Sequence, residues 1–335
     1  MRTFLIAGKL NAELKELPIP EPTVGEVRIR VAYVGVCGSD LHYYFDGANG
    51  AFVVQEPLIP GHELSGSIDL DPSGEFAVGT GVTVHPATYG KSEPAIINDP
   101  NIWPGGRYLG SAATMPHTQG AMSDYVIVRK DMVRVLPNGL SLQAAALAEP
   151  LAVALHAINI AGGVTGKKVL VSGSGPIGLL VAAAAALKGA TEVVSSDVLT
   201  GPLDRALAIG ATSTVEVTKQ ELPDSYFDCV FECSASPIAI SGALNAVRRG
   251  GMVVQVGMLG GGTHPIAIAP LVAKEISIKG AFRFNVEISE AVELLAREPK
   301  ISQCITHVIA AADVVSAFEI AKDSQISGKV LVDFQ

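Results

Sequence analysis

Apolar and polar residues alternate at the start of the segment Glu26–Val36, which is the pattern of a strand with one buried face. Shorter runs of similar character occur at Val82–His85 and Ser123–Val128, with glycine and proline between them. These patterns predict that residues 1 to about 140 form a β-rich domain. The first strand ends directly before Cys37 and so delivers this thiol to a loop.

The pattern changes at Ser141, where an Ala/Leu-rich stretch predicts a helix. Pro150 lies where that helix should break or restart, which places Glu149 at the interruption. Strand-like and helix-like segments then alternate, as in βαβ units, and predict an α/β fold with a doubly wound parallel sheet. These segments are Lys168–Ser172, Ile177–Lys188, Glu192–Asp197, Phe227–Cys233, Ile238–Val247, Met252–Val256 and Ile276–Phe282.

The part of the chain after Asn285 is predicted to hold two helices, Ser289–Arg297 and Asp313–Ser324, and a strand, Lys329–Phe334. Periodicity alone does not say which domain these elements join. A length of 335 residues exceeds one typical core and suits two domains.

The composition narrows the class of protein. Hydrophobic residues make up 48% of the chain and charged residues 17%, so a large core can form. The net charge of −9 argues against a nucleic-acid or anionic-membrane surface, because either would need clustered Lys and Arg. Small molecules are therefore the expected partners. The most apolar stretch, Ile177–Ala186, has about half of the ~20 residues that a spanning helix needs, and is predicted to be a core helix.

The N-terminal residues and the cysteines indicate the cellular compartment. Met1–Lys9 contains no apolar run long enough for a signal peptide. The four cysteines, at 37, 229, 233 and 304, are few and irregularly spaced, unlike the disulfide framework of a small secreted protein. A reduced, cytoplasmic environment is expected.

A glycine-rich loop indicates nucleotide binding. Gly173, Gly175 and Gly178 follow a predicted strand and open a predicted helix, the context of a dinucleotide-binding loop. The helix would begin at Pro176 and Ile177 and present free N–H groups to a phosphate. The pattern by itself is also compatible with a plain strand-to-helix turn.

Asp197 strengthens the nucleotide interpretation. It lies roughly 20 residues beyond Gly178, at the end of the next strand, where a carboxylate can accept both hydroxyls of a ribose. A 2′-phosphate would be repelled by this carboxylate and would need an Arg or Lys close by, which the segment Val198–Pro202 does not offer. NAD is therefore favoured over NADP.

Cys37, His62 and Glu63 supply a thiolate, an imidazole and a carboxylate, and all three groups bind Zn²⁺. Three protein ligands leave a fourth position open, which is typical of a catalytic zinc. Taken one by one, these residues also fit a buried thiol at a strand end and a His-Glu pair that serves the turn after Pro60–Gly61.

Four motifs occur in an order typical of one family: Gly35–Tyr43, Pro60–Glu63, Ala148–Val153 and Gly173–Gly178. Through them the chain resembles the zinc-dependent medium-chain dehydrogenases over nearly its whole length. Within that family it is similar to the polyol branch, the sorbitol dehydrogenases and especially the L-idonate 5-dehydrogenases. The segments that carry this closer similarity are His42–Tyr44, Leu109–Ala112, Val254–Met258 and Lys274–Phe284.

The resemblance implies a GroES-like catalytic domain from residues 1–146 together with 286–335, and a Rossmann-type NAD-binding domain from residues 147–285. It implies that Cys37, His62 and Glu63 bind one catalytic Zn²⁺. Glu149 would lie near the fourth position, either on the metal or on its water. A homodimer or homotetramer is implied as well.

The resemblance also implies how the alcohol proton leaves and how the metal site is supported. Ser39 and His42 match the hydroxyl and imidazole of the family's proton path, although His42 alone could be a loop residue bonded to backbone. Asp40 is similar to the acid that orients a zinc-bound histidine.

Substrate and cofactor positions follow from the same similarity. Tyr43, Glu149 and Arg283 fall where polyol-binding residues lie, although Arg283 could instead contact the cofactor or form a surface salt bridge. The implied cofactor positions are Gly173, Gly175, Pro176, Ile177, Gly178, Asp197, Val256, Gly257, Met258 and Phe282.

Two features depart from the family pattern. Many relatives hold a second zinc with four clustered cysteines, but the stretch His85–Gly120 contains none, so no structural zinc is expected there. Pro202 stands where sorbitol dehydrogenases tend to have an arginine against the adenosine, so cofactor affinity is expected to be weaker.

The expected function is zinc-dependent oxidation of a secondary alcohol on a sugar acid or polyol, with hydride transfer to NAD. L-Idonate, oxidised to 5-keto-D-gluconate, is the leading substrate, with sorbitol, xylitol and galactitol as alternatives. A zinc-free NADPH quinone reductase of the same superfamily would not need Cys37 or the His62-Glu63 pair. A non-catalytic protein with this fold would be expected to lose ligand or relay residues, all of which are present.

Overall fold

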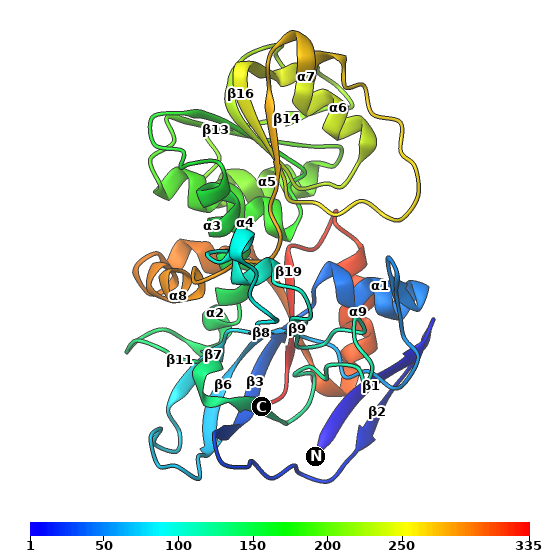
Figure 1. Ribbon diagram of the computed structural model, residues 1–335, viewed down its shortest axis with the longest axis vertical. Coiled ribbons are helices and arrows are strands. Elements are labelled where there is room, and N and C mark those ends of the chain that lie inside the picture. The colour runs from blue at the N-terminus through cyan, green and yellow to red at the C-terminus, as the bar shows by residue number, and fades with distance from the viewer. The chain divides into compact units, whose positions relative to one another are not determined.

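The computed structural model describes residues 1–335 and divides the chain into two compact units (Figure 1). The first unit contains residues 1–149, 288–322 and 329–335. The second contains residues 150–287 and the short segment 323–328. The chain therefore passes between the units four times.

The first unit is built around a seven-stranded sheet with the order β11-β7-β6-β3-β19-β18, to which β10 adds by pairing with β3. Neighbouring strands are antiparallel except β18 and β19, which are parallel. The expectation of a β-rich first domain is confirmed. The strands are β3 (Glu26–Gly35), β6 (Glu63–Leu70), β7 (Gly81–Val84), β10 (Tyr125–Arg129), β11 (Val133–Val135), β18 (Ile305–Ala310) and β19 (Lys329–Asp333).

The alternation of β3 produces the core of this unit. Val27 and Ile29 are fully buried, whereas the arginines between and after them reach the surface. Beside them Phe4 packs against Phe318 with ring centroids 5.3 Å apart. Each such side chain contributes about 1.5–3 kcal/mol when it leaves water, so the sheet is held mainly by this apolar face.

Shorter elements complete the first unit. The strands are β1 (Arg2–Gly8), β2 (Asn11–Glu16), β4 (Ala48–Asn49), β5 (Phe52–Val53), β8 (Ala87–Thr88) and β9 (Arg107–Tyr108). The α-helices are α1 (Gly38–Asp46), α2 (Leu142–Ala145), α8 (Ile288–Arg297) and α9 (Val314–Lys322). The 3₁₀ helices are η1 (Pro94–Ile96), η2 (Pro100–Ile102), η3 (Lys130–Met132), η4 (Pro299–Cys304) and η5 (Ala311–Asp313).

The predicted helix interruption near Glu149 is present. The Ser141 hydroxyl accepts a hydrogen bond from the Ala144 amide at 3.2 Å and caps α2. After α2, the helix α3 runs from Ala148 to Ile160. Pro150 lies in its first turn, where a missing N–H costs nothing. Glu149 is thereby fixed at a helix start.

The second unit contains a six-stranded sheet with the order β14-β13-β12-β15-β16-β17, and every neighbouring pair is parallel. The order reverses between β12 and β15, and ligands of such sheets bind at the carboxyl ends beside this point. The predicted doubly wound parallel sheet is confirmed. The strands are β12 (Lys168–Ser172), β13 (Glu192–Asp197), β14 (Ser213–Glu216), β15 (Phe227–Glu232), β16 (Val247–Gln255) and β17 (Ser277–Gly280).

Helices pack on this sheet. The helix α4 (Pro176–Leu187) packs on β12 and β13, α5 (Thr200–Ile209) on β13 and β14, and α6 (Pro237–Ala246) on β15 and β16. The short α7 (Ala269–Ala273) follows. Residues 179–185 of α4 are all buried, as expected for a core helix.

Some predicted ends were wrong. The last strand of the second sheet stops at Gly280, so Phe282 and Arg283 lie in the loop that follows. The helix expected over Asp313–Ser324 begins at Val314 and ends at Lys322, because Asp313 belongs to a 3₁₀ turn and Asp323 turns the chain with hydrogen bonds to Gln325 and Ser327. Cys233 follows β15 in a loop.

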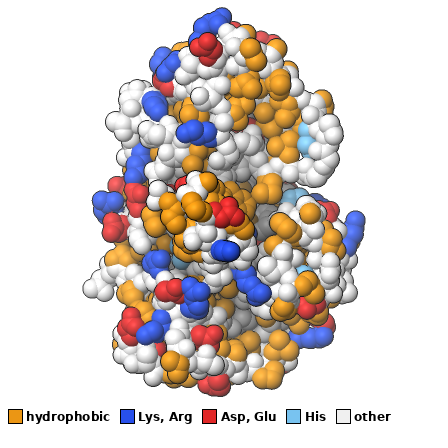
Figure 2. All heavy atoms as spheres, in the orientation of Figure 1, with side chains coloured by type: hydrophobic (Ala, Val, Ile, Leu, Met, Phe, Trp, Pro, Cys, Tyr) orange, Lys and Arg blue, Asp and Glu red, His pale blue; other side chains and the backbone are white.

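The surface shows no single dominant charge patch on the visible face. Figure 2 shows Lys and Arg side chains scattered among Asp and Glu. Among the helices, none combines the length and the apolar character needed to cross a bilayer.

The long segment of the second unit ends, directly before α8, at the buried residue Glu287. Glu287 accepts hydrogen bonds from the Asn159 amide at 3.0 Å and from the Asn285 backbone at 2.7 Å, and its Oε1 lies 2.9 Å from Nδ1 of His156. Burial alone would raise the pKa of Glu287, but the hydrogen bonds from His156 and Asn159 lower it to about 2. The charged form is therefore the one that the fold binds.

Glu287→Gln is expected to lower the free energy of unfolding at pH 7 by about 2 kcal/mol, because a charge-assisted hydrogen-bond network is lost. A lowered glutamate pKa stabilises the protein above the unfolded value of ~4.3, and this contribution disappears as pH falls toward 2. Urea unfolding at pH 7 and pH 3 measures this, with exposed Glu293→Gln as the control. An equal loss at both pH values would contradict the charge-based explanation.

Candidate functional site

Cys37 occupies the turn between β3 and α1, where it is the N-cap of the helix. The carboxylate of Asp40 accepts a hydrogen bond from the Cys37 amide at 3.0 Å and another from the Gly61 amide at 3.2 Å. Asp40 is fully buried. One buried acid thus joins the two loops that carry Cys37 and His62, through their backbones.

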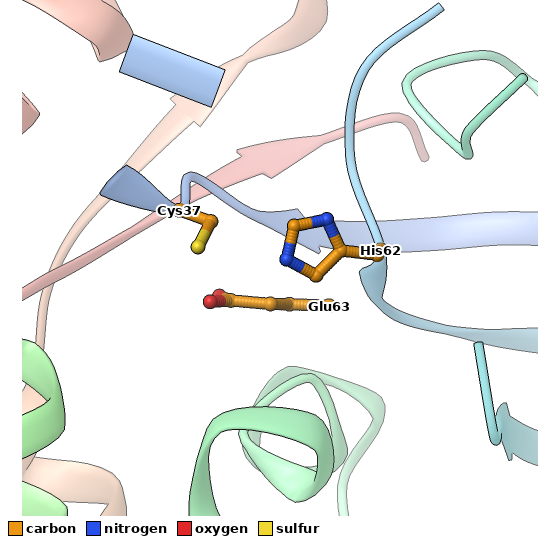
Figure 3. Close-up of side chains that lie close together, drawn as sticks. All are labelled: Cys37, His62 and Glu63. Carbon is orange, nitrogen blue, oxygen red and sulfur yellow. The ribbon is translucent and has the colours of Figure 1, made fainter. Parts of the chain in front are cut away.

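Cys37, His62 and Glu63 come together at this point. Their ligand atoms all lie within 4.8 Å of one another, and Figure 3 shows the thiol, one ring nitrogen and the carboxylate turned toward a common space. Glu63 begins β6 opposite Gly35 of β3. A Cβ at Gly35 would lie 2.0 Å from Oε2 of Glu63, so only glycine leaves room for this carboxylate.

Lys329 contacts the same carboxylate from β19. Its Nζ lies 2.6 Å from Oε2 of Glu63 and donates a hydrogen bond to Oε1 at 2.7 Å. A second bond, at 3.1 Å, goes to the carbonyl of Val36 next to Cys37. The lysine is 2% exposed. Sequence reasoning missed it, although a lysine at the head of an apolar strand is a usable signal.

Glu149 lies in the first turn of α3 and is 4% exposed. Its Oε1 accepts a short hydrogen bond, 2.5 Å, from the hydroxyl of Tyr108. The Tyr108 ring packs edge-on against His62, with centroids 5.3 Å apart. Tyr108 therefore links the Glu149 carboxylate to the imidazole, and no motif in the sequence indicated it.

The charges around this cluster are unbalanced. Burial alone would lower the pKa of His62, but Cys37, by charge and hydrogen bond, and the charges of Asp40 and Glu149 raise it to about 10. Burial raises the pKa of Asp40 and of Glu149, and the nearby Glu63 adds to both shifts. Four acidic groups thus surround the imidazole of His62 and the ammonium of Lys329. A divalent cation would reduce the repulsion among these acidic groups, which are those of Cys37, Asp40, Glu63 and Glu149.

The donor set fits Zn²⁺. Thiolate, imidazole and carboxylate bind zinc at about 2.0–2.3 Å, so ligand atoms around one tetrahedral ion lie about 3.3–3.8 Å apart. The donor atoms lie within 4.8 Å of one another, so they need to move closer by no more than about 1.5 Å to reach these distances. Nδ1 of His62 is buried without a hydrogen-bond partner, which leaves the imidazole orientation to Cys37 and to the packing of Tyr108.

The predicted relay residues and one predicted substrate residue, Tyr43, lie on α1. Ser39 is half-buried in the first turn, and His42, one turn further, is 60% exposed with Nδ1 2.9 Å from Asp46. Tyr43 is buried, and its hydroxyl accepts a hydrogen bond from the Ala112 amide at 3.1 Å. The helix therefore leads from the metal cluster toward solvent.

The glycine loop of the second unit has the geometry of a phosphate-binding turn. Gly173 has φ +90, and a Cβ there would lie 2.7 Å from the Ser234 amide. A Cβ at Gly178 would lie 1.9 Å from the Gly173 carbonyl, so α4 can approach the loop only without one. A Cβ at Gly175 would face open space, which is available to a ligand. Pro176 and Ile177 form the first turn of α4.

Asp197 is the last residue of β13 and lies beside this loop. Its Oδ2 accepts a hydrogen bond from the Ser174 amide at 2.8 Å, and its Oδ1 from the Leu199 amide at 3.1 Å. Each oxygen keeps a lone pair for a further donor. A cavity of about 860 Å³ opens here. The residues that line it include Gly173, Asp197, Val198, Ser234 and Ile238.

The remaining cofactor positions lie after β16 and β17. Val256 and Gly257 donate hydrogen bonds to the Glu232 carbonyl at 2.9 and 2.8 Å, and Met258 is exposed. Arg283 has φ +53, a strained value for a residue with a side chain, and its guanidinium carbon lies 4.7 Å from the centre of the Phe282 ring. Such strain is common at ligand sites.

Comparison with known proteins decides the family. The model of the alcohol dehydrogenase GroES-like domain matches residues 23–138, and that of the zinc-binding dehydrogenases matches residues 176–297. The L-idonate 5-dehydrogenase (NAD(P)(+)) of Escherichia coli K12 is 35% identical over 301 residues, which cover 88% of this chain and 87% of that protein. The chain belongs to the zinc-dependent medium-chain dehydrogenases.

Other relatives agree with this assignment to the polyol branch of the dehydrogenases. A sorbitol dehydrogenase of Bacillus subtilis is 33% identical over 307 residues, covering 88% of this chain and 86% of that enzyme. Among solved structures, the L-idonate 5-dehydrogenase of Escherichia coli has a TM-score of 0.93 at 32% identity, with 99% and 97% of the chains covered. The 2R,3R-butanediol dehydrogenase of Bacillus subtilis has a TM-score of 0.88 at 26% identity, with 99% of each chain covered.

Membership makes this dehydrogenase an oxidoreductase that acts on CH–OH groups, in a family that uses zinc and NAD(P). The expected GroES-like and Rossmann-type folds are confirmed.

In the stretch His85–Gly120, which contains no cysteine, aromatic contacts hold the loops together. Tyr89 packs against Trp103, and the Trp103 ring N–H donates a hydrogen bond to the Ile96 carbonyl at 2.8 Å.

Proposed function

We propose that this dehydrogenase oxidises a secondary alcohol of a sugar acid or polyol with NAD⁺, and that L-idonate is its preferred substrate. The observation that carries the proposal is the convergence of Cys37, His62 and Glu63 in an anion-rich cluster in which His62 and Glu63 are buried. The L-idonate relative supports the substrate, and the sorbitol dehydrogenases keep sorbitol, xylitol and galactitol as the alternative.

In this proposal, Cys37, His62 and Glu63 hold one zinc ion per chain, with Glu149 beside it, and there is no second zinc. When bound, zinc polarises the alcohol oxygen and lowers its pKa, while NAD⁺ accepts the hydride. Asp40 keeps the two ligand loops in place, and Tyr108 holds Glu149 through its hydroxyl.

The alcohol proton leaves along α1. Ser39 and His42 lie three residues apart on α1 and therefore on the same side of the helix, an arrangement that suits a relay from a hydroxyl to an imidazole. His42 is exposed and hydrogen-bonded to Asp46, so it can release the proton to water. Tyr43 supports this path by anchoring the loop at Ala112.

NAD is proposed as the cofactor. The loop from Gly173 to Gly178 and the first turn of α4 receive the pyrophosphate, and Asp197 accepts the ribose hydroxyls. Residues 147–285 form the NAD-binding domain in this proposal, and residues 1–146 with 286–335 form the catalytic domain. The assembly is proposed to be a homodimer or homotetramer.

A substrate screen tests the choice of substrate. With NAD⁺ and zinc-loaded protein, kcat/KM for L-idonate is expected to exceed the values for sorbitol, xylitol and galactitol, followed by absorbance of the reduced nicotinamide. A higher value for any of the three neutral polyols would favour the polyol alternative.

Arg283 supplies the proposed contact with the substrate carboxylate. Arg283→Ala is expected to raise KM for L-idonate by about tenfold, because a charge-assisted hydrogen bond is lost, with a smaller change for sorbitol. Arg283→Lys should retain part of the preference. Equal changes for both substrates would remove the carboxylate contact from the proposal.

A further inference from the structure

Residues Asp323–Gly328, between α9 and β19, pack with the second unit although both flanking elements belong to the first. We call this segment the clasp. Its Gln325 side chain accepts a hydrogen bond from the Gly201 amide at 3.4 Å and donates one to the Thr200 hydroxyl at 3.2 Å. The clasp thus sits on the first turn of α5, directly after Asp197.

Gly201 is the residue that lets the clasp pack closely against the first turn of α5. A Cβ at this position would lie 2.0 Å from the Gln325 carbonyl oxygen and 3.0 Å from its carbon. The backbone of Gly201 is helical, so an alanine would suit α5 itself. The absence of a side chain is required by the clasp and not by the helix.

Arg205 lies one turn further along the same face and is held by the clasp. Nη2 donates to the Ser324 carbonyl at 2.5 Å, and Nη1 donates to the Gln325 carbonyl at 3.2 Å. Nε is buried without a partner. The guanidinium therefore donates through Nη1 and Nη2 to two backbone carbonyls, while its Nε–H makes no hydrogen bond.

The charge of Asp197 acts on this arginine. Burial lowers the pKa of Arg205, while the Asp197 carboxylate acts in the opposite direction. The stretch Val198–Pro202 offers no cation, but Arg205 lies only three residues beyond it. A helical side chain leans toward the N-terminus of its helix, which here is the side of Asp197.

Given the proposed NAD site, we infer that the clasp sets the choice between NAD and NADP by keeping the Arg205 guanidinium on the Ser324 and Gln325 carbonyls. A 2′-phosphate beside Asp197 would meet a carboxylate and no available cation. A released guanidinium would offer a forked donor that matches phosphate. Selectivity for NAD then depends on a segment outside the nucleotide-binding motif.

The probes are 5′-AMP and 2′,5′-ADP, which differ only by the 2′-phosphate, titrated by calorimetry. Gly201→Ala should push the clasp away and tighten 2′,5′-ADP relative to 5′-AMP by about fivefold, as expected for one new charged contact. The double variant Gly201→Ala/Arg205→Ala should lose this gain. Arg205→Ala alone should leave 2′,5′-ADP binding within about twofold of wild type.

Two results would overturn the inference. A tenfold loss of 2′,5′-ADP affinity in Arg205→Ala alone would mean that the guanidinium already reaches the 2′ position. An unchanged ratio of the two affinities in both Gly201→Ala and Gln325→Gly would mean that the clasp has no influence. Gln325→Gly removes only the side-chain hydrogen bonds to α5, so it can replace Gly201→Ala in this test if Gly201→Ala is poorly folded.

A titration of the wild-type protein with NADH, added to those with the two probes, separates this inference from the proposed function. If the wild-type protein binds neither NADH nor 5′-AMP, the proposed cofactor site itself is wrong. If it binds both and the affinity ratio does not respond to the variants, only the role of the clasp is wrong. All of these readouts are independent of turnover.

Discussion

Cys37→Ser is expected to leave the protein without stoichiometric zinc and to reduce turnover by at least about a thousandfold. Thiolate is the softest and most strongly binding of the three donors, and a buried serine hydroxyl does not replace it. A loss of about 4 kcal/mol of transition-state stabilisation corresponds to this factor. The measurements are metal content after dialysis and the initial rate with NAD⁺.

The control for this variant is Cys229→Ala, which changes a buried thiol of β15 in the second unit, whereas the donor cluster belongs to the first. It should keep one zinc per chain and a turnover close to wild type. NADH affinity should stay within twofold in both variants, because the glycine loop and Asp197 are untouched. Full zinc content and activity in Cys37→Ser would contradict the proposed ligand set.

Lys329→Met is expected to destabilise the metal-free protein by about 3–5 kcal/mol, because it leaves the Glu63 carboxylate buried without its partner. Zinc should restore part of this loss, since the cation gives the same carboxylate a new partner. The shift of the unfolding midpoint on addition of zinc should therefore be larger in the variant than in the wild type. Calorimetry with and without zinc measures both effects.

Two matched variants accompany this test. Glu63→Gln/Lys329→Met removes both charges and should recover much of the metal-free stability, although it loses a zinc ligand. Lys300→Met, at an exposed lysine, should change stability by no more than about 0.5 kcal/mol. If the single variant at Lys329 is as stable as wild type without metal, the buried ion pair does not support the site.

Local patterns in the sequence predicted those parts of the fold and site that depend on near neighbours. The strand before Cys37 follows from alternation, and the segment from Lys168 to Asp197 follows from strand and helix periodicity. The glycine spacing reports steric contacts within one turn, such as Gly178 against the Gly173 carbonyl. Each of these interactions is determined by residues close together in the chain.

Contacts between distant residues were not predictable in this way. Lys329 meets Glu63 across 266 positions, and Tyr108 meets Glu149 across 41. Arg205 meets the clasp across about 120 positions, so its role was missed while the neighbouring segment was searched for cations. Helix ends also depended on side-chain bonds, as at Asp323, which no periodicity contains.

The place of β19 in the first sheet has a consequence for biosynthesis. Residues 150–287 of the second unit are continuous and can fold as soon as they leave the ribosome. The strand β19 lies between β3 and β18, and it is made after all of them. The sheet of the first unit and the buried ion pair between Lys329 and Glu63 are therefore completed only after the C-terminal residues have been made.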